Sequence, residues 1–199
     1  MSDRETLSVY DARAADYAKL IGAAAAPKDQ LDSFLGHLPQ PASILDLGCG
    51  PGTAAAQFAQ LGHNVVATDA SEGMIALASQ HPGVTARRES FDDIAGHAIY
   101  DGVWANFSLL HAERDALPLH LQAIAKALKP AGIFHIGMKT GQTTERDALG
   151  RRYTFVTQEE LTGLLSDEGL MPFAQFTGSD VGFAGTNDPW IVMQARKHA

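Results

Sequence analysis

The stretch from Ser43 to Thr53 reads SILDLGCGPGT, and it decides how the rest of the chain is interpreted. Its apolar part, residues 44–47, predicts a short buried strand, and the alanine-rich residues 54–58 predict the start of a helix. Glycine adopts backbone angles closed to other residues and lets a ligand approach the chain closely. A glycine turn between a strand and a helix N-terminus is therefore a nucleotide-binding arrangement, in which we expect free backbone amides to face the ligand.

A carboxylate follows at the distance that such an arrangement requires. Residues 65–68 predict a second apolar strand that ends at Asp69, roughly 20 residues past the glycines. A carboxylate at this position can accept hydrogen bonds from both hydroxyls of an adenosine ribose. The glycine turn and the acid together predict a ligand that contains adenosine.

The spacing of the glycines separates the candidate ligands. Gly48, Gly50 and Gly52 follow a G-x-G-x-G pattern, whereas pyrophosphate binders use G-x-G-x-x-G. Asp46, at the strand end, would repel a pyrophosphate but would help to hold a cationic amino group. The segment Leu45–Gly52 resembles the glycine motif of the class I S-adenosylmethionine-dependent methyltransferases, so the resemblance implies S-adenosylmethionine as the cofactor.

The resemblance also implies which residues contact that cofactor. Those after Asp69 would flank the adenine, with Met74 packed against it, although core filling is an equal alternative for Met74. Phe91 would offer a backbone amide to the adenine and Asp92 would accept from its amine. The full set of expected cofactor-binding residues is Asp46, Gly48, Cys49, Gly50, Asp69, Ala70, Met74, Phe91, Asp92 and Asn106.

The N-terminal segment predicts one amphipathic helix from Thr6 to Ile21, with Tyr10 and Tyr17 on the same face as Ala14. It resembles the lid of small methyltransferases, so we expect a helical lid over about residues 1–38, with both tyrosines at the substrate entrance. The alternative is a plain packing helix.

His111 follows the predicted fourth strand, which begins at Tyr100 and should lie beside the first strand. A histidine titrates near neutrality, so it is a candidate base for an acceptor hydroxyl or amine, and the alternative is a role in orienting the loop. Arg114 is a candidate for binding an anionic substrate, unless it lies in solvent.

The polar segment 139–153 is the part least typical of the family. Long polar loops at the carboxyl edge of such a sheet often determine specificity. We therefore expect Arg151, Arg152 and Tyr153 to bind a negatively charged or polar substrate, with a solvated loop as the alternative.

The end of the chain predicts two strands, Leu170–Phe176 and Trp190–Ala195, which a short glycine-rich turn joins. Strands joined so closely must be antiparallel. The predicted fold is thus an α/β three-layer Rossmann-like sandwich whose seven-stranded, mostly parallel sheet has an antiparallel strand 7.

Composition limits the remaining possibilities. The 199 residues suit a single domain, and a net charge of −8 disfavours nucleic acid as a partner. We expect a cytoplasmic monomer or homodimer, because Cys49 is the only cysteine and neither a signal peptide nor a membrane-spanning run is evident. The histidine spacing predicts no metal site.

Three functions fit these patterns. The first is transfer of a methyl group from S-adenosylmethionine to a small molecule by in-line displacement. The second is a non-catalytic binding protein on the same scaffold. The third, an NAD(P)-dependent oxidoreductase, fits poorly with Asp46, the glycine spacing and the final pair of strands.

Overall fold

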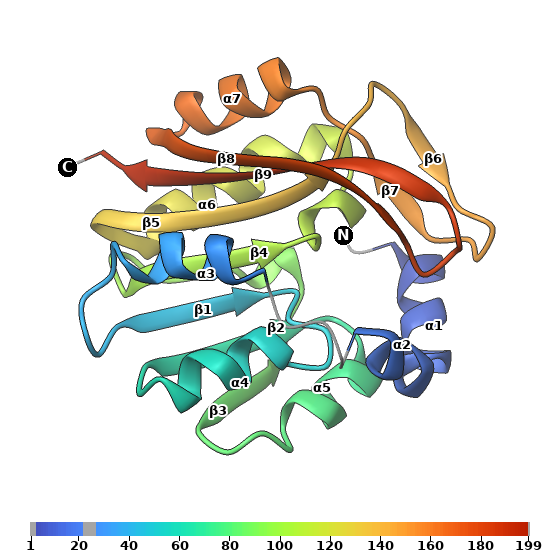
Figure 1. Ribbon diagram of the computed structural model, residues 1–199, viewed down its shortest axis with the longest axis horizontal. Coiled ribbons are helices and arrows are strands. Elements are labelled where there is room, and N and C mark those ends of the chain that lie inside the picture. The colour runs from blue at the N-terminus through green and yellow to red at the C-terminus, as the bar shows by residue number, and fades with distance from the viewer. Residues whose placement is uncertain (1–2, 22–26, 199) are drawn as a thin grey trace.

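Seven strands form a single sheet in the order β3-β2-β1-β4-β5-β9-β8 in the computed structural model, which describes residues 3–21 and 27–198 (Figure 1). A separate two-stranded sheet pairs β6 with β7. The strands are β1 (Ser43–Leu47), β2 (Asn64–Asp69), β3 (Val84–Arg88), β4 (Tyr100–Asn106), β5 (Leu128–Lys139), β6 (Thr144–Arg146), β7 (Arg152–Thr154), β8 (Leu170–Val181) and β9 (Asn187–Lys197).

The direction of the strands confirms the predicted fold class. Strands β3, β2, β1, β4 and β5 are parallel to their neighbours in this series, whereas β9 is antiparallel to both β5 and β8. Because β1 has β2 on one side and β4 on the other, the chain changes direction across the sheet at the carboxyl end of β1. Ligands of open α/β sheets bind at such a switch point.

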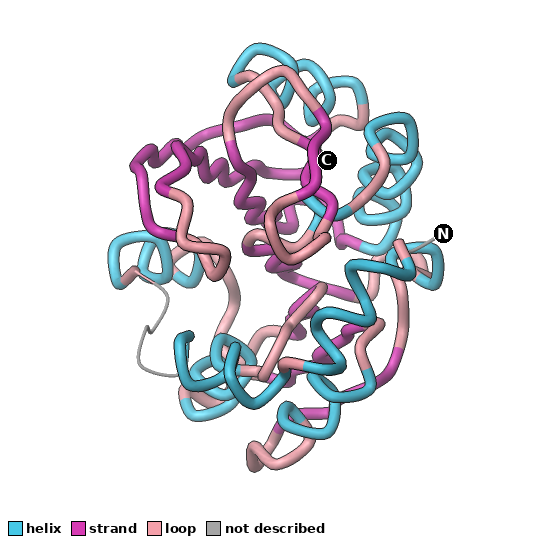
Figure 2. Tube along the Cα trace, turned by 90° about the vertical axis from the view of Figure 1, so that its right-hand side faces the viewer, coloured by secondary structure: helices cyan, strands magenta, loops and turns pink. Residues whose placement is uncertain are grey.

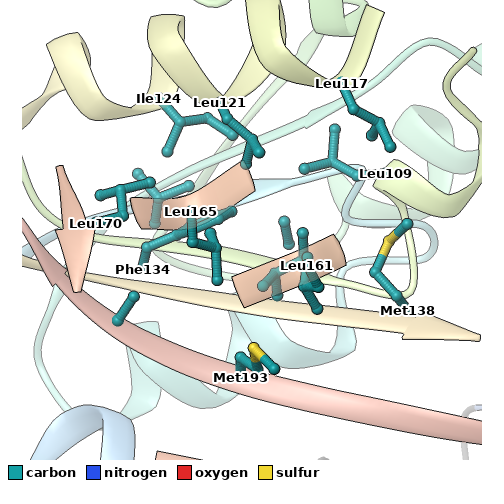
Figure 3. Close-up of a cluster of buried hydrophobic side chains, with 14 of the residues drawn as sticks. Leu109, Leu117, Leu121, Ile124, Phe134, Met138, Leu161, Leu165, Leu170 and Met193 are labelled. Carbon is teal, nitrogen blue, oxygen red and sulfur yellow. The ribbon is translucent and has the colours of Figure 1, made fainter. Parts of the chain in front are cut away.

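Side chains of the central strands alternate between two buried layers. In β1, Ile44 packs on one face while Leu45 and Leu47 pack on the other, as the period of a strand requires. One layer contains α3 (Lys28–Leu35) and α4 (Thr53–Gln60), and the opposite layer contains α6 (Leu117–Ala127) and α7 (Gln158–Asp167). Figure 3 shows leucines of α6 and α7 packed against Phe134, Met138 and Met193 of the sheet.

The predicted helix from Thr6 to Ile21 is wrong as a single element. The chain forms α1 (Arg4–Ala12) and α2 (Ala14–Ile21), which Arg13 separates with φ −122° and ψ 21°. Of the predicted lid over residues 1–38, residues 1–2 and 22–26 and the side chain of Ile21 lie outside the described residues. Helix α3 belongs to the layer on the sheet, because its Phe34 is fully buried there against Trp104.

Two hairpins and the first two helices meet at the carboxyl edge of the parallel strands, which Figure 2 views from that side. The predicted strands Leu170–Phe176 and Trp190–Ala195 are both too short, since β8 continues to Val181 and β9 begins at Asn187. The β6–β7 hairpin occupies most of the segment 139–153, which was predicted as a polar loop, and extends one residue beyond it to Thr154. Helix α5 (Glu72–Ala78) contacts α1 beside this edge.

Candidate active site

A cavity of about 640 Å³ lies at the carboxyl end of β1. Its wall is formed by the glycine turn, the end of β2, helices α1 and α2, the loops after β3 and β4, and both hairpins. All ten residues predicted to bind the cofactor line this cavity, and so do five of the seven predicted catalytic and substrate-binding residues: Tyr10, Tyr17, His111, Arg151 and Tyr153.

The glycine turn is held tightly against the neighbouring strand end. The amides of Gly48 and Cys49 both donate to the Thr68 carbonyl, at 2.7 and 2.9 Å, and the Gly50 amide donates to Asp69 Oδ2 at 3.0 Å. The expectation that free amides of the turn face the ligand is therefore wrong for these three residues. Gly48 has φ 68°, and a Cβ there would lie 2.3 Å from Ser108 Cβ, so only glycine fits.

Asp46 places a carboxylate at the N-terminus of α4. Its side chain is 3% exposed, and its Oδ2 accepts a hydrogen bond of 3.1 Å from the amide of Ala55 in the first turn. This carboxylate lies where a pyrophosphate binds in dinucleotide-binding folds. Burial raises the pKa of Asp46 to about 7, with the Ala55 amide opposing that rise. An ammonium group would favour its ionised form, so the site fits a cation better than a phosphate.

Asp69 ends β2 and is held by two backbone amides. Oδ2 accepts from Gly50, and Oδ1 accepts from the amide of Ser71 at 2.8 Å. Burial raises the pKa of this carboxyl, and the two amides oppose the rise. An ionised carboxylate has about four acceptor positions, so both oxygens keep capacity for ribose hydroxyls.

The residues after Asp69, which were expected to flank an adenine, include Ala70 and Met74 of the cavity wall. Ser71 caps α5 by accepting from the amide of Met74, and the Met74 side chain is 1% exposed. Phe91 and Asp92 belong to a short 3₁₀ turn that also lines the cavity. Burial strongly raises the pKa of the Cys49 thiol, so this side chain stays protonated and fills space.

Aromatic rings dominate the other end of the cavity. Tyr17 of α2 lies edge-on to Tyr10 of α1 and to Phe183 of the β8–β9 turn, at ring distances of 5.3 and 5.4 Å. Phe107, after β4, lies edge-on to Trp190 of β9 at 6.0 Å. The rings that line this end of the cavity are those of Tyr10, Tyr17, Phe107, Tyr153, Phe183 and Trp190.

Both cations at this end of the cavity already have carboxylate partners. Arg151 is 2% exposed, and its Nε and Nη2 donate to Asp147 Oδ2 at 2.9 and 2.7 Å. Lys139 donates to Asp188 Oδ2 at 2.6 Å, and its ammonium lies 3.9 Å from the centre of the Tyr153 ring. Their charges are thus neutralised within the protein, and the rings form the contact surface.

His111 lies in the cavity wall with both ring nitrogens engaged. Nε2 is 2.8 Å from the Tyr10 hydroxyl, and Nδ1 is 2.6 Å from the carbonyl of Arg152. Burial lowers the pKa of His111 to about 4, so the ring is neutral at physiological pH.

Arg114 and Arg152, both predicted to bind substrate, lie outside the residues that line the cavity. The guanidinium of Arg114 pairs with Glu160 of α7 and donates to the Phe155 carbonyl. That of Arg152 pairs with Glu113 at 2.9 Å and donates to the His111 carbonyl. These arginines hold chain segments together, which differs from the predicted role.

Sequence reasoning missed several residues of the aromatic end. Phe183 lies between Gly182 and Gly185 in a turn that was predicted only as a connection, and Trp190 was assigned only to a strand. The spacing of Asp147 and Arg151, four residues apart with opposite charge, could have indicated their pairing. An aromatic residue between glycines could likewise have drawn attention to the hairpin tip.

Neither a membrane-spanning helix nor a metal-binding cluster occurs in the described part of the chain. No helix in it is both long and apolar enough to cross a bilayer. Within the same residues, no group of three or more histidine, cysteine, aspartate and glutamate side chains is arranged to hold a metal ion.

Comparisons with known proteins agree with this geometry. Residues 44–132 match a family described as a methyltransferase domain. A Burkholderia thailandensis 1,6-didemethyltoxoflavin-N1-methyltransferase, solved with 1,6-didemethyltoxoflavin and S-adenosylhomocysteine, is similar over 98% of this chain and 88% of its own, with TM-score 0.79 and 27% identity.

Two curated relatives are similar over part of their length. A ubiquinone biosynthesis O-methyltransferase of Dinoroseobacter shibae is 29% identical over 65% of this chain, and a cypemycin N-terminal methyltransferase of a Streptomyces species is 31% identical over 63%. The matches span only 60% and 54% of those two proteins. The family match, the fold and the carboxylates at the glycine turn together support a class I S-adenosylmethionine-dependent methyltransferase.

Proposed function

We propose that this protein transfers a methyl group from S-adenosylmethionine to a small, flat, uncharged aromatic molecule that carries a nucleophilic N–H or O–H group. The cofactor would supply a methyl group already activated by the positive charge on sulfur. The task left to the protein is to hold nucleophile, carbon and sulfur in line, which can contribute about 7–11 kcal/mol.

The observation that carries this proposal is that one cavity is lined both by the carboxylates beside the glycine turn and by a set of aromatic rings. Asp46 and Asp69 offer carboxylates on either side of the glycine turn, which suits the ammonium and the ribose of the cofactor. Ala70, Met74, Phe91 and Asp92 would surround the adenine, and Asn106 lines the same cavity.

The aromatic end supports the proposed class of acceptor. Rings in edge-on contact form walls that suit a flat ring system. The pairing of Arg151 with Asp147 and of Lys139 with Asp188 argues against an anionic acceptor, which the sequence had favoured. The Burkholderia relative is an N1-methyltransferase of 1,6-didemethyltoxoflavin, which makes an N–H group a reasonable first choice of acceptor. The single cysteine and the net charge of −8 support a cytoplasmic, small-molecule role.

Binding measurements test the cofactor assignment. Titration calorimetry should give tight binding of S-adenosylhomocysteine and none of NADH. Asp69→Ala should weaken the binding of S-adenosylhomocysteine by more than about tenfold, because two charge-assisted hydrogen bonds to the ribose are lost. Asp167→Ala, an equivalent change at an exposed position of α7, is the matched control and should leave the affinity unchanged.

Turnover distinguishes the enzyme from a binding protein. We expect methyl transfer to members of a panel of aromatic N–H and O–H compounds that includes 1,6-didemethyltoxoflavin, and little transfer to aliphatic carboxylates or amines of similar size. Tight cofactor binding without transfer to any aromatic compound would favour the non-catalytic alternative. A preference for NADH would overturn the proposal.

A further inference from the structure

The hydrogen bonds around His111 have directions that chemistry fixes. The Arg152 carbonyl can only accept, so Nδ1 of His111 carries the ring proton and Nε2 holds a lone pair. The Tyr10 hydroxyl therefore donates to Nε2. Arg151 can only donate, so its Nη1, 2.9 Å away, gives a hydrogen bond to the Tyr10 oxygen. The result is a directed chain from Asp147 through Arg151 and Tyr10 to His111.

This chain prevents direct contact between an acceptor and His111. One nitrogen of the imidazole faces a backbone carbonyl and the other faces the Tyr10 hydroxyl, so neither is open to the cavity while α1 is in place. A proton that reaches His111 from the cavity must pass through the Tyr10 oxygen. Tyr10 itself lines the cavity, next to Tyr17.

Resting on the methyltransferase function proposed above, we propose that Tyr10 takes the proton of the acceptor while its own hydroxyl proton passes to Nε2 of His111. The lone pair released on the acceptor forms the bond to the methyl carbon, and the carbon–sulfur bond breaks with its electron pair going to sulfur. One positive charge disappears at sulfur and one appears on His111, so the total charge within the cavity is unchanged.

Arg151 is the positioning residue of this relay. Two of its nitrogens are held by Asp147, which fixes the third on the Tyr10 oxygen. Its charge stabilises negative charge that develops on that oxygen during transfer. Asp147 in turn stabilises the imidazolium, whereas Arg151 and Lys139 oppose it, and the neutral rings of Tyr10 and Tyr153 pack against His111.

The relay depends on the position of α1, because this helix carries Tyr10. Tyr10 belongs to α1, which is fastened at its start by the ion pair of Asp3 with Arg146, at 2.9 Å. Thr6 Oγ1 accepts from the amide of Arg152 at 2.9 Å. Asp11, near the end of α1, accepts from the Ser71 hydroxyl at 2.6 Å. These contacts place the Tyr10 hydroxyl beside His111 and hold α1 against the cavity.

The experiment compares Tyr10→Phe with His111→Ala, the double variant and the control Tyr100→Phe, whose ring lies outside this cavity. We expect Tyr10→Phe and His111→Ala each to lower kcat for the best aromatic acceptor of the panel by about 10²–10⁴-fold. The double variant should be no slower than either single one, because both remove the same path. Binding of S-adenosylhomocysteine should stay close to that of the unchanged protein. Each variant is assayed well below its own melting temperature, because Tyr10→Phe removes the acceptor of Arg151 Nη1 and lowers stability.

A second readout is independent of turnover. Nitrogen-15 NMR of His111 in the unchanged protein should show a neutral ring protonated at Nδ1, and Tyr10→Phe should shift the Nε2 resonance. A ring protonated at Nε2 would overturn the relay, as would normal or faster turnover of Tyr10→Phe beside an impaired His111→Ala. Failure of the unchanged protein to methylate any acceptor would instead count against the proposed function, and the relay would fall with it.

Discussion

Asp46 combines a cost to stability with a proposed use in binding. Burial raises its pKa to about 7, while the unfolded chain releases this proton near pH 4. Folding therefore takes up a proton between these two values, and the free energy of unfolding falls as the pH rises through this window. Above pH 7 the folded protein carries a buried, ionised carboxylate whose stated partner is one backbone amide.

Asp46→Asn should accordingly make the protein without cofactor more stable at pH 8. The amide oxygen can still accept from Ala55, and no charge is buried. Because each pKa unit corresponds to about 1.4 kcal/mol, we expect a gain of about 1–3 kcal/mol in urea unfolding. The same change should weaken S-adenosylhomocysteine binding at least about tenfold, through loss of the ammonium partner. Asp167→Asn is the exposed control. A variant less stable than the unchanged protein at pH 8 would contradict this account.

Among the elements, the segment 139–157 is held in place by Arg114. This arginine was expected to bind substrate, but its contacts are structural. The guanidinium of Arg114 pairs with Glu160 of α7 and donates to the carbonyls of Gln142, Thr143 and Phe155. It therefore ties α7 to both ends of the segment that carries Arg151 and Tyr153.

Arg114→Ala should lower the free energy of unfolding by about 2 kcal/mol, because the Phe155 carbonyl and the Glu160 carboxylate lose a charged donor. Limited proteolysis should cut faster within residues 139–157, and S-adenosylhomocysteine affinity should hardly change. Arg87→Ala removes an exposed arginine whose contact with Glu89 is 4.0 Å, and it should cost little. A selective rise in KM for the acceptor without any loss of stability would restore the substrate-binding interpretation of Arg114.

The elements also show what local sequence can and cannot predict. The glycine turn, the strands beside it and the carboxylates Asp46 and Asp69 follow from short-range spacing, because a strand, a turn and a helix are each encoded within a few residues. The antiparallel final strand follows from loop length alone. The contact of Tyr10 with His111 joins residues about a hundred positions apart, and no spacing rule reaches that far.

The element boundaries that were predicted wrongly also depended on local sequence patterns alone. The break between α1 and α2 at Arg13 lies in a segment whose apolar pattern continues unbroken through both helices. The extensions of β8 and β9 pair polar residues with each other, such as Asp180 beside Asp188, and a pattern of apolar alternation does not detect such pairs.

For the molecule as a whole, a buried polar layer links the sheet to the cavity. His135 is fully buried and stacked on Trp104 at 3.4 Å. Its Nε2 donates to Asn106 Oδ1 at 3.1 Å, and its Nδ1 accepts from the Gln194 amide at 3.2 Å. A second ring proton would face an amide donor, so this histidine is held neutral, and burial lowers its pKa well below the ordinary value.

The buried histidines and Asp46 have opposite effects on stability between pH 4.5 and 6. The pKa values of His111 and His135 are lowered by burial, so the unfolded chain binds their protons and the folded protein does not. Stability then rises with pH as this difference disappears near 6.5. Asp46 has the opposite effect, because in this range the folded protein binds its proton and the unfolded chain does not. Burial also lowers the pKa values of His63 and His120 and raises that of Asp69. The effects of these shifts on stability have opposite signs and partly offset each other.

On unfolding, two histidines take up protons and one carboxyl releases a proton, so the net uptake is about one proton. The free energy of unfolding should therefore rise by roughly 1 kcal/mol per pH unit. Urea unfolding at pH 4.5, 5.25 and 6 should show this slope in the unchanged protein. His135→Gln removes one titrating group, so the slope should fall to near zero whatever its cost in absolute stability. Asp46→Asn should increase the slope to roughly 2 kcal/mol per pH unit, since the opposing proton is gone. An unaltered slope in His135→Gln would mean that the layer between Asn106 and Gln194 accepts a proton in the folded protein, and the neutral ring assigned here would be wrong.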